Sequence, residues 1–263
     1  MAVDPLIPPF GITGLVVFVI GTLIGSFLTV CIYRLPREGS IVAPRSACPA
    51  CGEKIRWFDN IPLLSFILLG GRCRSCRASI SYRYPIVELV NGMGYVVILW
   101  RFGWGWPALV YGIFFSALLT ITWIDWDHFI IPDAVTLPGI LLGVLCAWWV
   151  LPVGLVNSLI GVIVGGGLLL AIAWISPFLF GKEGLGGGDI KLLAMVGAFL
   201  GWQLVLATLM IASILGTLVG VGLIALRAMK RGQYMPFGPY LALGAVISLL
   251  FGHQIMAWYL GMI

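Results

Sequence analysis

The sequence predicts an all-α polytopic membrane protein, and three observations lead to that fold class. Of the 263 residues, 61% are hydrophobic and only 10% are charged, whereas about a quarter of the residues in a soluble domain carry a charge. Long uncharged stretches recur along the chain, and the alternating apolar and polar pattern of a membrane β-barrel is absent. Helices satisfy their own backbone hydrogen bonds in lipid, so the spanning segments are expected to be helical.

The apolar runs divide into about eight predicted transmembrane helices, since one crossing needs roughly 20 residues. The first span covers Phe10 to Tyr33. It is expected to be retained, because Met1 to Pro9 has no basic residue and no small-residue cleavage site follows the run. The other spans are expected at 85–100 and 106–124, as two spans in 134–181, as two spans in 192–226, and at 237–260.

Two of these runs are too long for one crossing. The 48 uncharged residues 134–181 would extend about 72 Å as one helix at roughly 1.5 Å per residue, so we divide them at Leu151-Pro-Val-Gly154. The 35 uncharged residues 192–226 would extend about 52 Å. We divide this run at Gly201-Trp-Gln203, which leaves the sixth span short.

The distribution of Lys and Arg agrees with this topology, because cytoplasmic loops carry the excess of basic residues. If residues 34–84 are cytoplasmic, eight crossings place 14 of the 15 basic residues inside and only Arg101 outside. A single crossing at 192–226 would move the three basic residues that follow it outside. With eight crossings, both termini are external. The expected parts of the chain are a first span (1–33), a cytoplasmic insert (34–84) and a seven-span core (85–263).

The insert carries two Cys-x-x-Cys pairs separated by 21 residues: Cys48, Cys51, Cys73 and Cys76. Two such pairs present four thiolates in the tetrahedral arrangement of a structural zinc site, which leaves no position open for catalysis. The alternative is four cysteines without metal, reduced or in disulfides, but disulfides are rare in a reducing cytoplasm. We therefore expect a cytoplasmic Zn²⁺-binding loop between the first two helices.

The insert is also strongly basic. Its nine basic and three acidic residues give a net charge of +6, which is expected to draw it to anionic lipid head groups of the membrane. Nothing in it resembles a groove-reading helix or an aromatic platform for bases, so no nucleic-acid partner is expected.

Two acidic residues are expected at one membrane face on different helices. Asp125 ends the third span and Asp189 begins the sixth, and the topology places both of these ends on the cytoplasmic side. Charged groups at such borders usually face a protein interior or a water-filled cavity. Paired carboxylates suit an aspartyl hydrolase, in which the ionised one deprotonates water and the protonated one polarises the scissile carbonyl. Such a pair titrates jointly, so neither residue is assigned a fixed role.

Asp125 is preferred over Asp127 because two positions on a helix are separated by about 200° around its axis. Asp127 is expected further into the following loop, and Asp133 is expected at the start of the fourth span, where a carboxylate suits the helix dipole. Gly186 and Gly188, just before the second aspartate, are expected to let the backbone turn sharply and to let a substrate strand approach. A simple flexible connector is the alternative interpretation of these glycines.

The chain resembles the type IV prepilin peptidases, the membrane-embedded leader peptidases and N-methyltransferases of type IV pilus and type II secretion systems. The resemblance covers essentially the whole chain. It rests on the double Cys-x-x-Cys loop and on two aspartate motifs, the second being Gly186-Gly-Gly-Asp189. Three further stretches match the family: Gly25-Ser-Phe-Leu-Thr-Val-Cys-Ile-Tyr-Arg-Leu-Pro36, Arg83-Tyr-Pro-Ile-Val-Glu-Leu89 and Met235-Pro-Phe-Gly-Pro-Tyr-Leu241.

The resemblance implies that Asp125 and Asp189 are the catalytic pair of a bacterial inner-membrane enzyme whose active site faces the cytoplasm. It implies cleavage of the short basic leader of a prepilin or pseudopilin, followed by methylation of the new N-terminal residue from S-adenosylmethionine. The methyl-donor site is not assigned, because the sequence has no nucleotide-type methyl-donor motif. Thr29 stands where many members of the family have asparagine, and this difference concerns the efficiency of the methyl-transfer step.

The basic insert should repel a basic leader, so lipid head groups or acids such as Glu88 and Glu183 are expected to receive it. Two alternatives for the whole chain are considered. A presenilin-like or preflagellin-type intramembrane aspartyl protease shares the Gly-x-Gly-Asp motif but does not require the cysteine loop. An ion- or proton-coupled transporter would use intramembrane acids, but both acids are expected at one membrane edge and none near the midplane.

Overall fold

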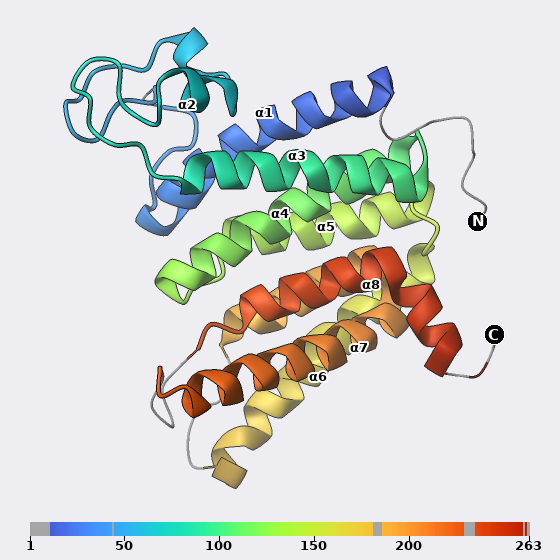
Figure 1. The fold of residues 1–263 in the computed structure, drawn as a ribbon. Helices are drawn as coiled ribbons and strands as arrows, with labels where there is room; N and C mark the ends of the chain where they lie inside the picture. The colour runs from blue at the N-terminus through green and yellow to red at the C-terminus, as the bar shows by residue number, and fades with distance from the viewer. Residues whose placement is uncertain (1–10, 44, 181–185, 229–234, 260, 262–263) are drawn as a thin grey trace. The chain divides into compact units, whose positions relative to one another are not determined.

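The structure, a computed structural model, describes residues 11–43, 45–180, 186–228, 235–259 and 261. Regular structure in these ranges is helical, apart from two isolated β-bridges. The helices in chain order (Figure 1) are α1 (Ile12–Arg34), η1 (Leu35–Arg37), η2 (Trp57–Asn60), α2 (Leu64–Leu68), α3 (Arg83–Phe102), α4 (Trp106–His128), α5 (Asp133–Trp149), α6 (Leu155–Phe180), α7 (Gly187–Ala225) and α8 (Gly238–Tyr259). Glu183, one of the acids considered for leader binding, lies outside the described residues.

Six helices in the described ranges are long and apolar enough to cross a membrane, namely α1, α3, α4, α6, α7 and α8. The chain is therefore a multi-pass membrane protein, with α5 as a shorter apolar helix of 17 residues. α7 runs for 39 residues but is interrupted at Gly201, where a φ of 80° and a ψ of 172° are not helical. This interruption falls where the sequence predicted a division between spans. The total of eight crossings stays a prediction.

Several helices extend beyond the predicted spans at their polar ends, and two of these extensions concern the candidate site. α4 continues to His128, so Asp127 lies on the helix and not in the loop expected for it. α7 begins at Gly187, two residues before Asp189, which was expected to begin the sixth span. Both differences have one cause: hydropathy marks the residues that suit hydrocarbon, whereas the backbone hydrogen bonds of a helix continue into the polar residues beyond it.

The chain divides into two compact units, residues 1–120 and 121–263, and the division falls within α4. The first unit holds α1, the insert, α3 and most of α4, and the second holds the end of α4 and the helices α5 to α8. All four candidate metal ligands belong to the first unit, and both candidate catalytic aspartates belong to the second. Each candidate site is therefore built within one unit.

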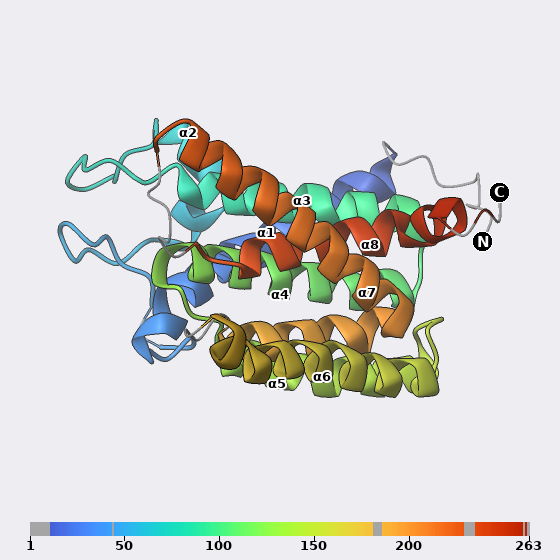
Figure 2. The same ribbon diagram turned by 90° about the horizontal axis from the view of Figure 1, so that it is seen from below.

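In the first unit, α1 and α3 pack against each other along small residues (Figures 1 and 2). A Cβ added to Gly21 would lie 2.8 Å from the Cα of Gly92, and one added to Gly25 would lie 2.8 Å from the Cα of Glu88. Glycines four positions apart thus let the two backbones approach closely, as small residues do in membrane helix pairs. The Asn91 side-chain amide donates to the Gly21 carbonyl at 2.7 Å across the same interface.

The first half of α7 is the centre of the second unit. α7 contacts α5, α6 and α8, and its residues 192–201 are all buried. A helix that is apolar all round is expected to be enclosed in this way. α6 approaches it closely because Gly161 and Gly197 face each other without side chains. This packing fixes the first turn of α7, which carries Asp189.

Candidate active site and metal centre

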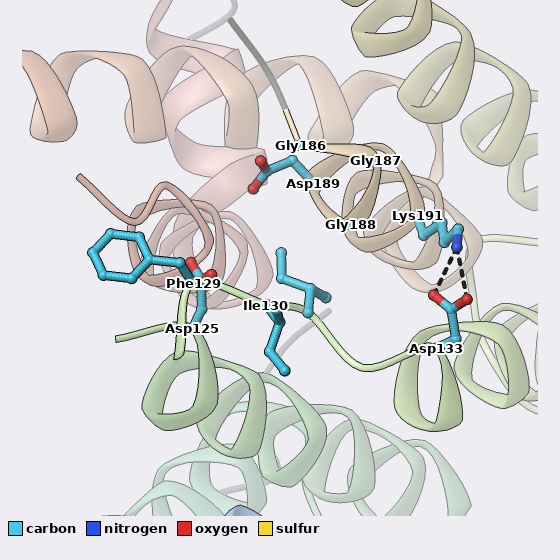
Figure 3. A pocket seen from close by; sticks show the side chains of 10 residues that line it. Asp125, Phe129, Ile130, Asp133, Gly186, Gly187, Gly188, Asp189 and Lys191 are labelled. Carbon is cyan, nitrogen blue, oxygen red and sulfur yellow. Dashed lines mark hydrogen bonds and ion pairs between the residues drawn. The ribbon is translucent and has the colours of Figure 1, made fainter. Parts of the chain in front are cut away.

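A cavity of about 330 Å³ opens in the second unit, where the end of α4 and the starts of α5 and α7 meet (Figure 3). Both aspartates proposed from the sequence line it. Its lining residues are Asp125, Phe129, Ile130, Ile131, Asp133, Gly186, Gly187, Gly188, Asp189 and Lys191. The structure thus brings together two carboxylates that are 64 positions apart in the sequence.

Asp125 lies in the last turn of α4 and is only 5% exposed. Its Oδ2 accepts a hydrogen bond from the backbone N–H of Gly238, at 2.9 Å, at the start of α8. A Cβ at position 238 would lie 2.6 Å from that oxygen, so only glycine allows this approach. No role was predicted for Gly238 from the sequence, although it lies in residues 235–241, one of the stretches that match the family.

Asp189 lies in the first turn of α7 and is 9% exposed. Its Oδ1 is buried and has no hydrogen-bond partner among the described residues. Buried polar atoms are nearly always hydrogen-bonded, so an orphaned carboxylate oxygen calls for an explanation. A water molecule or a substrate group in the cavity would supply the partner.

The glycines before Asp189 lie at the start of α7 and line the cavity. Their expected role, a sharp turn and the approach of a substrate strand, stays a prediction. Gly186 has an extended backbone with a φ of −74°, and Gly187 begins the helix, so no left-handed turn occurs there. The missing side chain matters at Gly188, where an added Cβ would lie 2.8 Å from the Cβ of Ile131. Gly188 therefore allows the α4–α5 connection to pack against the first turn of α7.

An ion pair crosses the rim of the cavity. The Nζ of Lys191 lies 2.7 Å from both carboxylate oxygens of Asp133, and both side chains are partly exposed. Asp133 is the first residue of α5, as expected from its favourable interaction with the helix dipole. The pair joins the start of α5 to the first turn of α7, two residues beyond Asp189.

The four cysteines of the insert form a cluster in the first unit. Their Sγ atoms all lie within 4.8 Å of one another, and those of Cys48 and Cys76 are 3.8 Å apart. Zinc at about 2.3 Å from each of four sulfurs in a tetrahedron requires sulfurs about 3.8 Å apart. Each pair lies in a tight turn. The backbone N–H of Gly52 donates to the Cys48 carbonyl in the first turn, and the backbone N–H of Arg77 donates to the Cys73 carbonyl in the second. The donor set and its spacing fit a structural Zn²⁺ ion.

The electrostatics of the cluster also favour a cation. Hydrogen bonds from the backbone N–H groups of Cys51 and Ala50 lower the pKa of Cys48 to about 6. The pKa of Cys51 is raised to about 12, because the neighbouring thiols of Cys76 and Cys48, together with desolvation, outweigh the hydrogen bond from the Glu53 backbone. The fold thus favours a first thiolate but opposes a second one beside it. A bound metal ion would remove that repulsion.

Two buried carboxylates at one cavity of a helical membrane protein are typical of membrane-embedded aspartyl hydrolases, and comparison with known proteins identifies the family. Residues 19–102 match the bacterial peptidase A24 N-terminal domain, and residues 112–221 match the type IV leader peptidase family. The chain belongs to the type IV leader peptidase family. Known solved structures include no significant match to this chain.

Several relatives carry the name prepilin leader peptidase/N-methyltransferase. The protein of that name from Pseudomonas aeruginosa is 40% identical, over 92% of this chain and 91% of its own length. The one from Aeromonas hydrophila is 40% identical, over 93% and 92% respectively. The one from Myxococcus xanthus is 42% identical over 78% of this chain and 61% of its own length. These relatives favour a leader peptidase over the transporter and the presenilin-like protease.

Proposed function

We propose that this protein is a membrane-embedded aspartyl endopeptidase that removes the leader of type IV prepilins or pseudopilins and N-methylates the new N-terminal residue. The observation that carries the proposal is the placement of Asp125 and Asp189 on one cavity. The names of relatives about 40% identical over almost the whole chain supply the substrate class and the second activity.

The proposed hydrolysis uses the two carboxylates as an acid and a base. One carboxylate is ionised and takes a proton from a water molecule, whose oxygen attacks the scissile carbonyl carbon. The other is protonated and donates a hydrogen bond to the carbonyl oxygen. The tetrahedral intermediate then collapses, and a proton passes to the leaving amine as the C–N bond breaks. The N–H of Gly238 holds Asp125 in place, while the orphaned Oδ1 of Asp189 remains available to water or substrate.

The proposed setting is the bacterial inner membrane, with the active site and the cysteine loop facing the cytoplasm. The basic insert would then lie against anionic head groups, which would also attract a basic leader. Glu88 is less suited to leader binding than the sequence suggested, because it is 7% exposed and already accepts the N–H of Leu63. Lipid head groups and Glu183, which lies outside the described residues, remain as the proposed attraction for the leader.

Two bound species accompany the proposal. The four cysteines would hold one structural Zn²⁺, which shapes the insert and takes no part in hydrolysis. S-adenosylmethionine would supply the methyl group, and the residues that bind it are not assigned. Thr29, where the family often has asparagine, lies on α1 and donates its hydroxyl to the Ser26 carbonyl of its own helix at 2.7 Å.

Incubation of the purified protein with a prepilin and radiolabelled S-adenosylmethionine tests both activities together. We expect a shortened pilin that carries the label at its new N-terminus. An uncleaved substrate would contradict the peptidase, and a cleaved but unlabelled product would contradict the methyltransferase.

Metal analysis of the purified protein tests the zinc site. We expect one zinc per chain in the native protein and a large loss in a Cys48→Ser/Cys73→Ser variant. Cys31→Ser serves as a matched control, because that cysteine is buried in α1 and lies outside the cluster. A cluster variant that binds as much zinc as the native protein would remove the claim.

A further inference from the structure

The short helix α2 carries an apolar surface that the structure leaves exposed. Four aliphatic side chains form this α2 surface, with exposed fractions of 39% for Ile61, 49% for Leu64, 72% for Ile67 and 75% for Leu68. Ser65 of the same helix is buried, and its hydroxyl donates to the Phe58 carbonyl within the insert. Clustered exposed apolar side chains indicate a binding surface.

The start of α2 is tied to a membrane-spanning helix of the same unit. The backbone N–H of Leu63 donates to Oε2 of Glu88 on α3 at 2.8 Å, and the Ser26 hydroxyl on α1 hydrogen-bonds the same carboxylate. Leu63 has a φ of 61°, which is unfavourable for a bulky residue. A second contact joins the ring of Phe66 on α2 to that of Tyr82 just before α3, with 5.5 Å between the ring centroids.

This tether sets the depth of α2 relative to the spanning helices. Glu88 follows Arg83, the first residue of α3, by five positions, which is about 7.5 Å along the helix axis. Figure 1 shows α2 beside the first turns of α3. The α2 surface therefore lies level with the end of a membrane span. Interfacial helices bury their apolar side by about 5–10 Å at this border.

The surroundings of the α2 surface suit a lipid interface. Tyr33 at the end of α1 and Tyr82 just before α3 are exposed aromatic residues, as in the aromatic belts at membrane borders. Ile86 and Leu89 continue the exposed apolar surface along α3. The insert around them has a net charge of +6, which complements anionic head groups.

We propose that the α2 surface inserts into the head-group and acyl boundary of an anionic bilayer, the same bilayer that α1 and α3 cross. Glu88 acts as the tether that holds α2 at this depth, and α2 in turn holds the cysteine loop against the membrane. The proposal is independent of the peptidase and methyltransferase activities.

Fluorescence quenching in vesicles tests the insertion. A fluorescent amino acid replaces Ile67 in the full chain, reconstituted in phosphatidylcholine and phosphatidylglycerol vesicles, and a control chain carries it at the exposed Lys54 of the first cysteine turn. We expect a lipid spin-labelled near its head group to quench the probe at 67 severalfold more than the probe at 54, and aqueous iodide to do the reverse. Efficient iodide quenching at 67 overturns the proposal. Protection from both quenchers also overturns it, because it means that protein covers the surface.

A double variant tests whether the insertion of α2 protects the insert from protease. Ile67→Ser/Leu68→Ser removes the two most exposed apolar side chains of α2, and Val42→Ser, at 87% exposure outside α2, is the control. In the same vesicles, we expect trypsin to cut the insert of the double variant severalfold faster than that of the native chain or the control. Equal rates in all three proteins overturn the proposal. If the double variant does not fold, the quenching measurement on the probe at 67 still decides.

Discussion

The side chain of Asp125 is held by one backbone N–H, that of Gly238, and this contact requires glycine. Because an added Cβ would lie 2.6 Å from Oδ2, Gly238→Ala must displace the carboxylate or the start of α8. A misplacement of about 1 Å at a reacting group can lower the rate by about 100-fold. We expect Gly238→Ala to insert and fold but to lose prepilin cleavage on that scale, measured as kcat/KM on a purified prepilin.

The matched control for this change is Gly216→Ala. Its added Cβ would meet the side chains of Phe237, just before α8, and Tyr240, in the first turn of α8, at 3.7 Å, an ordinary van der Waals distance. We expect near-native cleavage in this variant. Equal activity of Gly238→Ala and Gly216→Ala would mean that the N–H contact does not position Asp125.

The sequence allowed Asp125 and Asp189 to be proposed, because a carboxylate beside a long apolar run is costly and therefore informative. It did not reveal the partner of Asp125, since the hydrogen bond comes from a residue 113 positions away. The packing contact of Gly188 was not foreseen for a similar reason. Its lack of a side chain serves a contact with Ile131 on another connection, and one sequence does not display such contacts.

At the scale of elements, the interruption of α7 at Gly201 leads to a prediction about the stability of the protein. The φ and ψ of this residue, 80° and 172°, fall in a region that is essentially restricted to glycine and costs other residues about 1–3 kcal/mol. An added Cβ would also lie 2.7 Å from Val153. We expect Gly201→Ala to lower the apparent melting temperature of the protein in detergent.

Gly222→Ala is the control for this prediction. It lies on the same helix, and no atom lies within 4 Å of its added Cβ, so alanine is expected to stabilise the helix by about 0.5–1 kcal/mol. A melting temperature of Gly201→Ala equal to that of the native protein would show that α7 is continuous through residue 201.

Helix order and the divisions between helices followed from apolar run lengths, and the structure confirms the breaks at 150–154 and at Gly201. The ends of the helices were less accurate. Asp127 lies on α4 and Gly187 on α7, because hydropathy reports the membrane border and not the last backbone hydrogen bond. The short helix α2 was not predicted at all, since five residues carry too little periodicity.

At the scale of the whole molecule, the chain forms two compact units that divide within α4. The sequence indicated the spans, the insert and the cysteine cluster, but run lengths and spacing contain no information on which helices pack together. The division within a continuous helix was therefore not foreseen. The prediction of eight crossings with the insert in the cytoplasm rests on the distribution of basic residues.

Metal removal should affect the first unit locally. Binding of zinc supplies about 10–16 kcal/mol of apparent free energy in zinc-finger peptides, whereas the insert buries little apolar surface of its own. We expect a chelator to release zinc and to make the segment between Cys48 and Cys76 sensitive to protease, while the spanning helices stay folded by circular dichroism. An insert that resists protease equally with and without zinc would contradict a structural role for the metal.

The most direct test of the proposed chemistry replaces each aspartate by asparagine, which keeps the shape of the side chain but cannot transfer the proton. Asp125→Asn and Asp189→Asn are each assayed for cleavage of a prepilin, with Asp127→Asn as the control, because that neighbouring side chain is exposed and does not line the cavity. We predict that both cavity variants insert and fold but lose cleavage, while Asp127→Asn retains it. Native cleavage by either Asp125→Asn or Asp189→Asn would contradict the proposed catalytic pair.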